Sequence, residues 1–199
     1  MKNSITRMLV LVLLFFSSMI YACGDNPNAL VQGPFEDNSF TNGFICFQSA
    51  PDKRDIYFYL SRINNGKLYN SKVDTFYYSD APVELMTIFF MQINGYRNVV
   101  VLLRWHVNYE GNGVEYPYYY EVKSYKHDEG RGYIKNLDGE KDPQLSGYQI
   151  KSNGNIQNFP LDNAEKIKKF CALSMVYDFY LPHESSGSNN KLNQCRRLS

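Results

Sequence analysis

The side chains able to perform chemistry are few, and their spacing matches no catalytic motif. The histidines His106, His127 and His183 form no HExxH or other metal-ligand spacing, and GxSxG is absent. Carboxylate pairs such as Glu110 with Glu115 occur, but nothing places one member in an apolar pocket, as acid–base catalysis needs. We therefore expect no catalytic residue, no cofactor and no metal ligand set, and we interpret the chain as a protein that is not an enzyme.

One acidic stretch leaves calcium binding undecided. Residues 137–142 read Leu-Asp-Gly-Glu-Lys-Asp, which supplies carboxylates without the alternating ligands of an EF-hand loop. The stretch is equally well explained as a hydrophilic loop.

The cysteines are the other reactive groups, and we expect them to form disulfides. Cys23, Cys46, Cys171 and Cys195 include no CxxC and no zinc-site spacing. Four cysteines allow three pairings, which sequence alone does not distinguish. We predict Cys171 with Cys195, and Cys46 with Cys23 if Cys23 is unmodified.

The N-terminus predicts export. Lys2 and Arg7 precede an apolar run of about thirteen residues, well below the roughly 20 that span a bilayer, and Ala22 ends the segment. We expect a cleavable signal over 1–22, a single β-rich domain over 23–182, and a polar, flexible tail over 183–199. The predicted location is the bacterial periplasm, or the membrane surface facing it.

Cys23 has two interpretations that remain open. Signal cleavage leaves it as an ordinary first residue, whereas Ile20–Cys23 resembles a bacterial lipobox, in which the cysteine is acylated. Acylation would be the chain's link to a membrane. Removing 1–22 takes away Lys2 and Arg7 from 21 basic residues and leaves 20 acidic ones, a balance of about −1. This balance gives no electrostatic case for nucleic acid or for an anionic membrane surface.

The elements that must position these residues are mostly strands. Residues 23–43 are expected to be irregular, and 83–125 predict a three-stranded antiparallel meander with turns at Asn94-Gly95 and Gly111-Asn112. A helix is predicted from Asp162, with Glu165 completing a capping box, to about Phe179. The fold class is α+β, mostly β: an antiparallel meander sheet, with a two-layer sandwich as the alternative, and one C-terminal helix. The expected strands cover 44–50, 56–63, 67–69, 75–78, 83–93, 98–109 and 114–125, with short ones near 133–134 and 148–150.

A turn at Gly111-Asn112 fixes the predicted register of the last hairpin. Trp105 then lies opposite Tyr118 on an apolar face, and Arg104 lies opposite Tyr119 on a more polar one. Pro117 lacks an N–H, so its strand is expected to be an edge or to carry a bulge.

The more polar face is the predicted partner-binding site. It carries Arg104, His106, Tyr119 and Glu121, and arginine and tyrosine dominate binding hot spots. The chain has 17 tyrosines and one tryptophan, which suggests a tyrosine-rich contact surface. The competing prediction is that the helix 162–179 covers this face, since it also carries Val100 and Leu102.

The overall organisation resembles the periplasmic immunity proteins of bacterial type VI secretion toxin–immunity pairs. The resemblance rests on a short exported chain, a signal ending at Cys23, a β-rich body and the lack of a catalytic set, without a diagnostic motif. It implies an exported inhibitor that neutralises a secreted toxin or hydrolase by protein–protein contact. The alternatives are an exported hydrolase of unrecognised type and a structural envelope lipoprotein.

Overall fold

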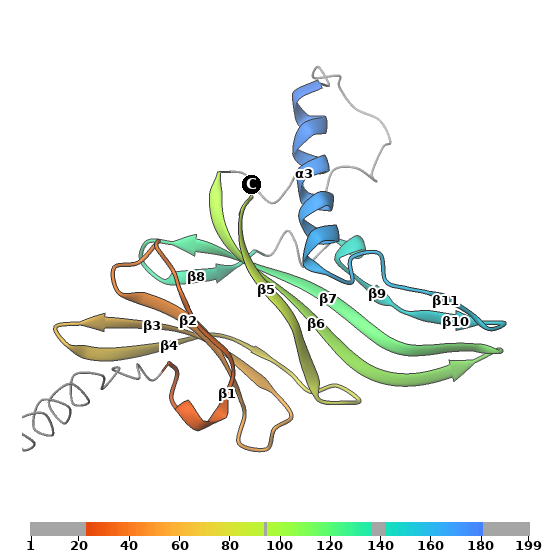
Figure 1. Ribbon diagram of the computed structural model, residues 1–199, viewed down its shortest axis with the longest axis horizontal. Helices are drawn as coiled ribbons and strands as arrows, with labels where there is room; N and C mark the ends of the chain where they lie inside the picture. Colours follow the sequence, from red (N-terminus) through yellow and green to blue (C-terminus); the bar gives the residue numbers. More distant parts are fainter. Residues whose placement is uncertain (1–22, 94, 137–141, 181–199) are drawn as a thin grey trace, which may run out of the picture.

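The computed structural model describes residues 23–93, 95–136 and 142–180, with the backbone alone for 173–180. The predicted signal 1–22 and the predicted tail 183–199 lie outside these residues. The described chain forms two antiparallel sheets and one long helix (Figure 1), which confirms the predicted α+β, mostly β class.

The first sheet is a simple meander of four strands. Each strand pairs with its sequence neighbour, and Asn65 and Gly66, both with positive φ, form the tight turn between the last two. Two predictions are corrected here. A strand forms within the segment expected to be irregular, and 67–76 is one strand where two were predicted. The strands are β1 (Leu30–Glu36), β2 (Gly43–Ser49), β3 (Ile56–Asn64) and β4 (Lys67–Phe76).

The second sheet is built around one long strand. The predicted meander is confirmed as β5, β6 and β7, and β7 pairs with β6 along one side. The other side of β7 pairs in turn with three short strands. The strands are β5 (Val83–Ile93), β6 (Tyr96–Gly111), β7 (Val114–Asp128), β8 (Gly132–Lys135), β9 (Ser146–Tyr148), β10 (Ile150–Ser152) and β11 (Asn155–Gln157).

The helix α3 (Ala164–Tyr180) begins two residues later than predicted. The side chain of Asn163 accepts the backbone N–H of Lys166 at 3.1 Å and so acts as the N-cap. Asp162 instead pairs with the Lys166 ammonium at 2.7 Å. The predicted capping box of Asp162 and Glu165 is therefore replaced by an Asn163 cap. Two 3₁₀ turns, Pro27–Ala29 and Pro143–Leu145, complete the regular structure of the described residues.

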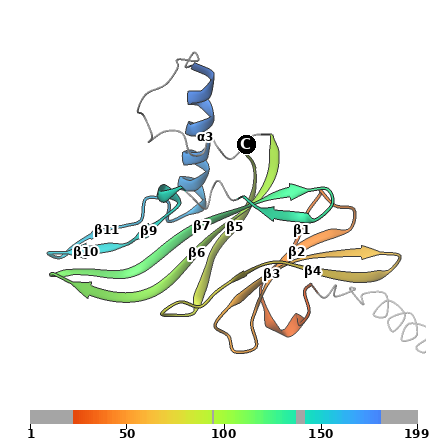
Figure 2. The same cartoon turned by 180° about the vertical axis from the view of Figure 1, so that it is seen from behind.

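Two cores hold three layers together (Figures 1 and 2). The first core lies between the sheets, and the second lies between the second sheet and the first turns of α3. Both faces of β6 are therefore buried, as its run Val99–Leu103, nowhere more than 1% exposed, requires. The first core includes Ile45, Phe47, Phe58, Leu60, Val101, Leu103, Trp105 and Tyr125. The second includes Val100, Leu102, Tyr120, Val122, Phe159, Leu161, Ile167 and Cys171.

The register of the β6–β7 hairpin differs from the prediction. The turn residues are Asn112 and Gly113, both with positive φ, so the predicted turn at Gly111-Asn112 is one residue too early. A bulge then places Val107 and Asn108 opposite Pro117, where a ladder donor is missing. Pro117 was predicted to lie in an edge strand or a bulged one; a bulge does form at Pro117, but its extra residue belongs to the partner strand β6, and β7 is not an edge. As a consequence of the turn and the bulge, Trp105 pairs with Tyr119 and Arg104 with Tyr120. The predicted pairs Trp105 with Tyr118 and Arg104 with Tyr119 are wrong.

The structure bears on the two interpretations of Cys23. Cys23 and Cys46 form a disulfide, as predicted for unmodified Cys23, and both are buried against the outer face of the first sheet. The same sulfur cannot also carry a thioether-linked lipid, so the structure favours the unmodified form. Cys171 is buried in the second core, and its predicted partner Cys195 lies outside the described residues.

Candidate functional site

The structure divides the four predicted partner-binding residues between two faces of the second sheet. Tyr119 lies on the first-sheet side, where it packs against Trp105, and Glu121 lines the same cavity. Arg104 and His106 lie on the helix side, where both pack against the ring of Tyr118. The single polar face predicted from the sequence does not exist, because the one-residue change of register separates the two pairs. Val100 and Leu102 are buried with α3, as the competing prediction proposed.

Arg104 is held in place by the protein itself. Its guanidinium pairs with the Glu84 carboxylate at 2.6 Å and lies 4.4 Å from the centre of the Tyr118 ring. Burial opposes the charge, but hydrogen bonds with Glu84 and Tyr120 outweigh that cost and raise the pKa of Arg104. The arginine therefore joins β5 to β6 and β7, and it is three-quarters buried.

Five aromatic rings form a continuous line that begins at Trp105 on the first-sheet face. We call Trp105, Tyr119, Tyr148, Tyr116 and Tyr109 the aromatic stripe. Successive ring centres lie 5.9, 5.0, 5.5 and 5.8 Å apart. The stripe begins at Trp105, which is 6% exposed, and ends at Tyr109, which is 63% exposed. The stripe thus runs from the packed body of the protein to the exposed end of the β6–β7 hairpin.

The buried end of the stripe opens into a cleft of about 400 Å³. One wall is the segment between β4 and β5, which is fixed because Trp105 Nε1 donates to the backbone oxygen of Tyr77 at 3.0 Å. Tyr77 remains 68% exposed at the rim. The opposite wall carries Glu121 and Lys123, whose charged groups pair at 2.8 Å. The cleft therefore has aromatic walls, and the Glu121–Lys123 ion pair lies at its border.

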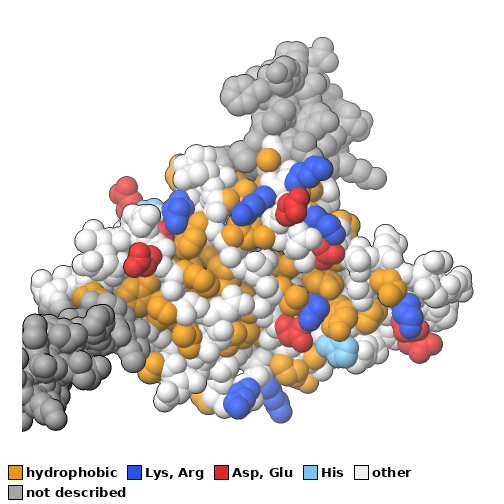
Figure 3. Space-filling model, viewed as in Figure 1, with side chains coloured by type: hydrophobic (Ala, Val, Ile, Leu, Met, Phe, Trp, Pro, Cys, Tyr) orange, Lys and Arg blue, Asp and Glu red, His pale blue; other side chains and the backbone are white. Residues whose placement is uncertain are grey.

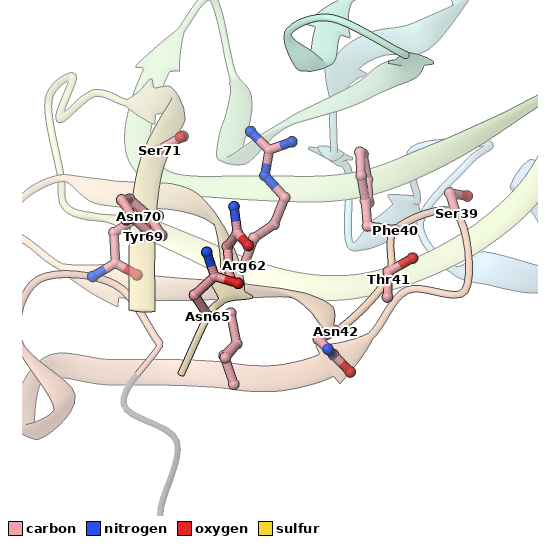
Figure 4. Close-up of a pocket in the computed structure, with 11 residues that line it drawn as sticks. Ser39, Phe40, Thr41, Asn42, Arg62, Asn65, Tyr69, Asn70 and Ser71 are labelled. Atoms are coloured by element: carbon pink, nitrogen blue, oxygen red, sulfur yellow. The ribbon is translucent and has the colours of Figure 1, made fainter. Parts of the chain in front are cut away.

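A second hollow, of about 880 Å³, lies on the first sheet between the loop 39–42 and the β3–β4 hairpin (Figure 4). Its lining is mostly asparagine, serine and threonine, with Arg62 near its middle. The amide of Asn70 is used internally, since it donates to the Gly24 backbone oxygen at 2.6 Å and accepts from Ser61 at 2.7 Å. The hollow is thus lined mainly by uncharged polar residues, with Phe40, Ile63 and Tyr69 among them.

A buried ionic cluster behind that loop has a structural role. The carboxylate of Asp37 is buried, accepts the Tyr133 hydroxyl, and pairs with Arg97 at 3.0 Å. Burial and the neighbouring Asp37 charge together raise the pKa of Tyr133 far above its ordinary value. The cluster ties the β1–β2 loop to β6 and β8 and leaves the carboxylate fully engaged.

The described residues that line the two hollows include no histidine or cysteine. No cluster of side chains able to hold a metal ion occurs among the described residues. His127 packs against Phe40 with ring centres 4.7 Å apart, and His183 is outside the described chain. Residues 137–141, most of the stretch considered for calcium, also lie outside it. No helix in the described ranges is long and apolar enough to cross a membrane.

Sequence reasoning missed most of the stripe. Tyr148 could not be assigned to it, because the pairing of β9 with β7 joins segments that no local pattern connects. The signal that was present is the cluster of tyrosines at 116–120, which predicted an aromatic surface without its direction. No protein-family model, curated protein or solved structure matches this chain, so its function is inferred from the site itself.

Proposed function

We propose that this chain is an exported binding protein that neutralises a secreted toxin or hydrolase by protein–protein contact, in the manner of an immunity protein. The aromatic stripe is the contact surface. The observation that carries the proposal is the line of rings that begins buried at Trp105 and ends exposed at Tyr109.

The stripe has the physical character of a protein hot spot. Tyrosine and tryptophan bury large areas and lose little side-chain entropy, and here their neighbours already restrict them. Polar pairs flank the rings, with Glu121–Lys123 at the cleft and Glu115–Lys151 at the hairpin end. An apolar centre with a polar border is the usual anatomy of a protein interface.

Ring geometry favours a protein over a flat ligand. Successive ring planes of the stripe are inclined by 39° to 77°. Rings tilted in this way share no flat platform on which a sugar or a nucleobase could stack along the line. Irregular side chains of a protein partner can fill the notches between them.

The shape of the molecule suits an inhibitor. The end of the β6–β7 hairpin, with β10 and β11 beside it, extends away from the first sheet (Figures 1 and 2). A projecting, aromatic-tipped hairpin can enter the substrate cleft of a hydrolase. The buried Cys23–Cys46 disulfide supports an oxidising compartment, which agrees with the export predicted from residues 1–22.

The test is protection of cells. Cells that express the toxin-like product of a neighbouring gene in the periplasm should survive when this chain is co-expressed. Tyr109→Ala and Tyr148→Ala should abolish protection while the melting temperature stays unchanged.

The control is Tyr96→Ala, which removes a tyrosine of similar exposure outside the stripe. Equal loss of protection with Tyr96→Ala would contradict the assignment of the stripe. Catalytic turnover by the chain alone would support the exported-hydrolase alternative instead. Among the described residues no observation favours that alternative, and the engaged sulfur of Cys23 weighs against the lipoprotein alternative.

A further inference from the structure

The exposed edges of the two sheets are protected to very different degrees. An edge strand presents unpaired backbone groups to any passing chain, and proteins block this with lysines, prolines, bulges or short strands. In the first sheet, β1 contains Pro34 and two irregularities of register, and β4 carries Lys67 and Lys72 and a bulge. The far side of the second sheet ends in strands of three or four residues.

The remaining edge, β5, has little such protection. It is eleven residues long, contains one charged residue, Glu84, and pairs with β6 alone among the strands that the structure describes. Its sequence contains neither lysine nor proline. A bulge at Met86 interrupts its N-terminal half, where the Gln32 side chain also donates to the backbone oxygen of Leu85 at 3.2 Å. The open part of the edge is therefore Thr87–Ile93.

Both cores are incomplete along this open part. Ile88 and Phe90 pack against the first core, and Phe89 and Met91 pack against the second, yet all four remain partly exposed. In Figure 3 hydrophobic side chains gather over this region of the second sheet. One added strand would extend both cores at once, since its alternate side chains would fall on the two faces.

Charge indicates what kind of strand would fit. Arg97 lies 4.2 Å from the centre of the Phe90 ring on the first-sheet face, and Lys168 of α3 lies 4.9 Å from that of Phe89 on the other. Arg97 already pairs with Asp37 at 3.0 Å, so the cation offered to a strand beside β5 is Lys168, on the helix face. Of two adjacent carboxylates in that strand, one would point to the helix face and meet Lys168.

We propose that the Thr87–Ile93 edge binds an extended, apolar segment of another protein, which joins the second sheet as an added strand and directs a carboxylate to Lys168. This surface is separate from the aromatic stripe, so it is a second mode of recognition. A second copy of this chain fits less well. An antiparallel pairing of two open edges would centre on Phe90 and bring the Lys168 cations of both copies to one seam.

The test uses a synthetic fluorescent peptide with two adjacent glutamates inside a run of valine and threonine, and the intact oxidised chain. Binding is followed by fluorescence anisotropy, and hydrogen exchange should slow in 83–93 but not in 155–157. Replacing both glutamates by lysine should weaken binding about tenfold or more, because like charges on neighbouring strands repel each other. Methylating alternate peptide amides should abolish binding, because it removes backbone donors and changes no side chain.

Lys168→Glu should weaken the glutamate peptide about fivefold, whereas Lys169→Glu, an equally exposed neighbour on the same helix, should not. No binding of the unmethylated peptide, or equal binding of the methylated peptide, would overturn the proposal. The proposal would also be overturned if the chain sedimented as a dimer and its 83–93 amides were already protected from hydrogen exchange without peptide, because the edge would then bind a second copy. Tyr109→Ala should leave peptide binding unchanged, which separates this test from that of the stripe.

Discussion

The strand β6 passes through two very different environments, and the change falls at its bulge. Its first half, Val99–Leu103, is at most 1% exposed and lies between two cores. Beyond Val107–Asn108 the same strand is mostly exposed and carries Tyr109 at its end. We call the described part built around the two cores the packed body, and we call 106–118 with 146–157 the arm. In the body the aromatic residues stabilise the fold, whereas in the arm they remain available for contact with a partner.

Trp105→Ala tests the boundary between the two regions and should have the largest effect. The side chain is 6% exposed in the first core and also begins the stripe. Its loss should destabilise the fold by about 3–5 kcal/mol, the usual cost of removing a large core aromatic. Urea unfolding measures this, with Tyr77→Ala as the exposed neighbouring control. An unchanged unfolding midpoint would place Trp105 with the arm rather than the body.

Reduction of the Cys23–Cys46 disulfide should have the next largest effect, and it should fall on the body. The bond closes a separation of 23 residues, and the chain-entropy model gives about 3 kcal/mol for such a loop. Thermal unfolding of the oxidised chain and of the Cys23→Ala/Cys46→Ala double variant measures the difference. Peptide mapping that found both thiols unbonded in the exported protein would refute the pairing.

The loss of stability at alkaline pH, which we call the alkaline limb, offers a further test of the body, with a smaller expected effect. Burial, followed by the hydrogen bond to Asp25, raises the pKa of Tyr59 to about 12. In the unfolded chain Tyr59 ionises near pH 10, whereas in the folded chain it stays neutral until about pH 12. The contribution of Tyr59 to the free energy of unfolding is therefore complete below pH 10 and is lost as the pH rises towards 12.

Tyr59→Phe removes the ionising group and should flatten that limb between pH 10 and 12. It should also cost about 1 kcal/mol at neutral pH from the lost hydrogen bond. Denaturant unfolding across the pH range checks both effects. A Tyr59→Phe curve parallel to that of the unmodified chain would show that another group controls the limb.

The smallest stability effect is expected in the arm. Tyr109→Ala should change the free energy of unfolding by no more than about 0.5 kcal/mol, because the ring is 63% exposed. Partner binding should nevertheless fall at least tenfold, as at a hot spot. Calorimetry of the partner complex beside thermal unfolding of the free chain measures both quantities. A large loss of stability would show that the arm belongs structurally to the body.

The body was largely predictable from the sequence, and the arm was not. Local patterns of apolar residues and Asn-Gly turns correctly predicted the meander and the helix. The register failed for two reasons: the turn lies one residue later than predicted, and the bulge at Val107–Asn108 opposite Pro117 then changes the pairing by one residue. That shift is enough to move Arg104 and His106 away from Tyr119 and Glu121. Long-range pairings such as Tyr119 with Tyr148 leave no trace in local spacing.

The asymmetry of β7 has a kinetic consequence. One side of β7 is paired by the single long strand β6, and the other by β8, β9 and β10, each of three or four residues. Strands so short are not stable alone and need the β6–β7 hairpin as a template. We therefore expect folding to form that hairpin first and to add the short strands later. In the native state β9 and β10 should open and close repeatedly while the hairpin stays intact, so the side of the arm that carries Tyr148 would be remodelled without global unfolding.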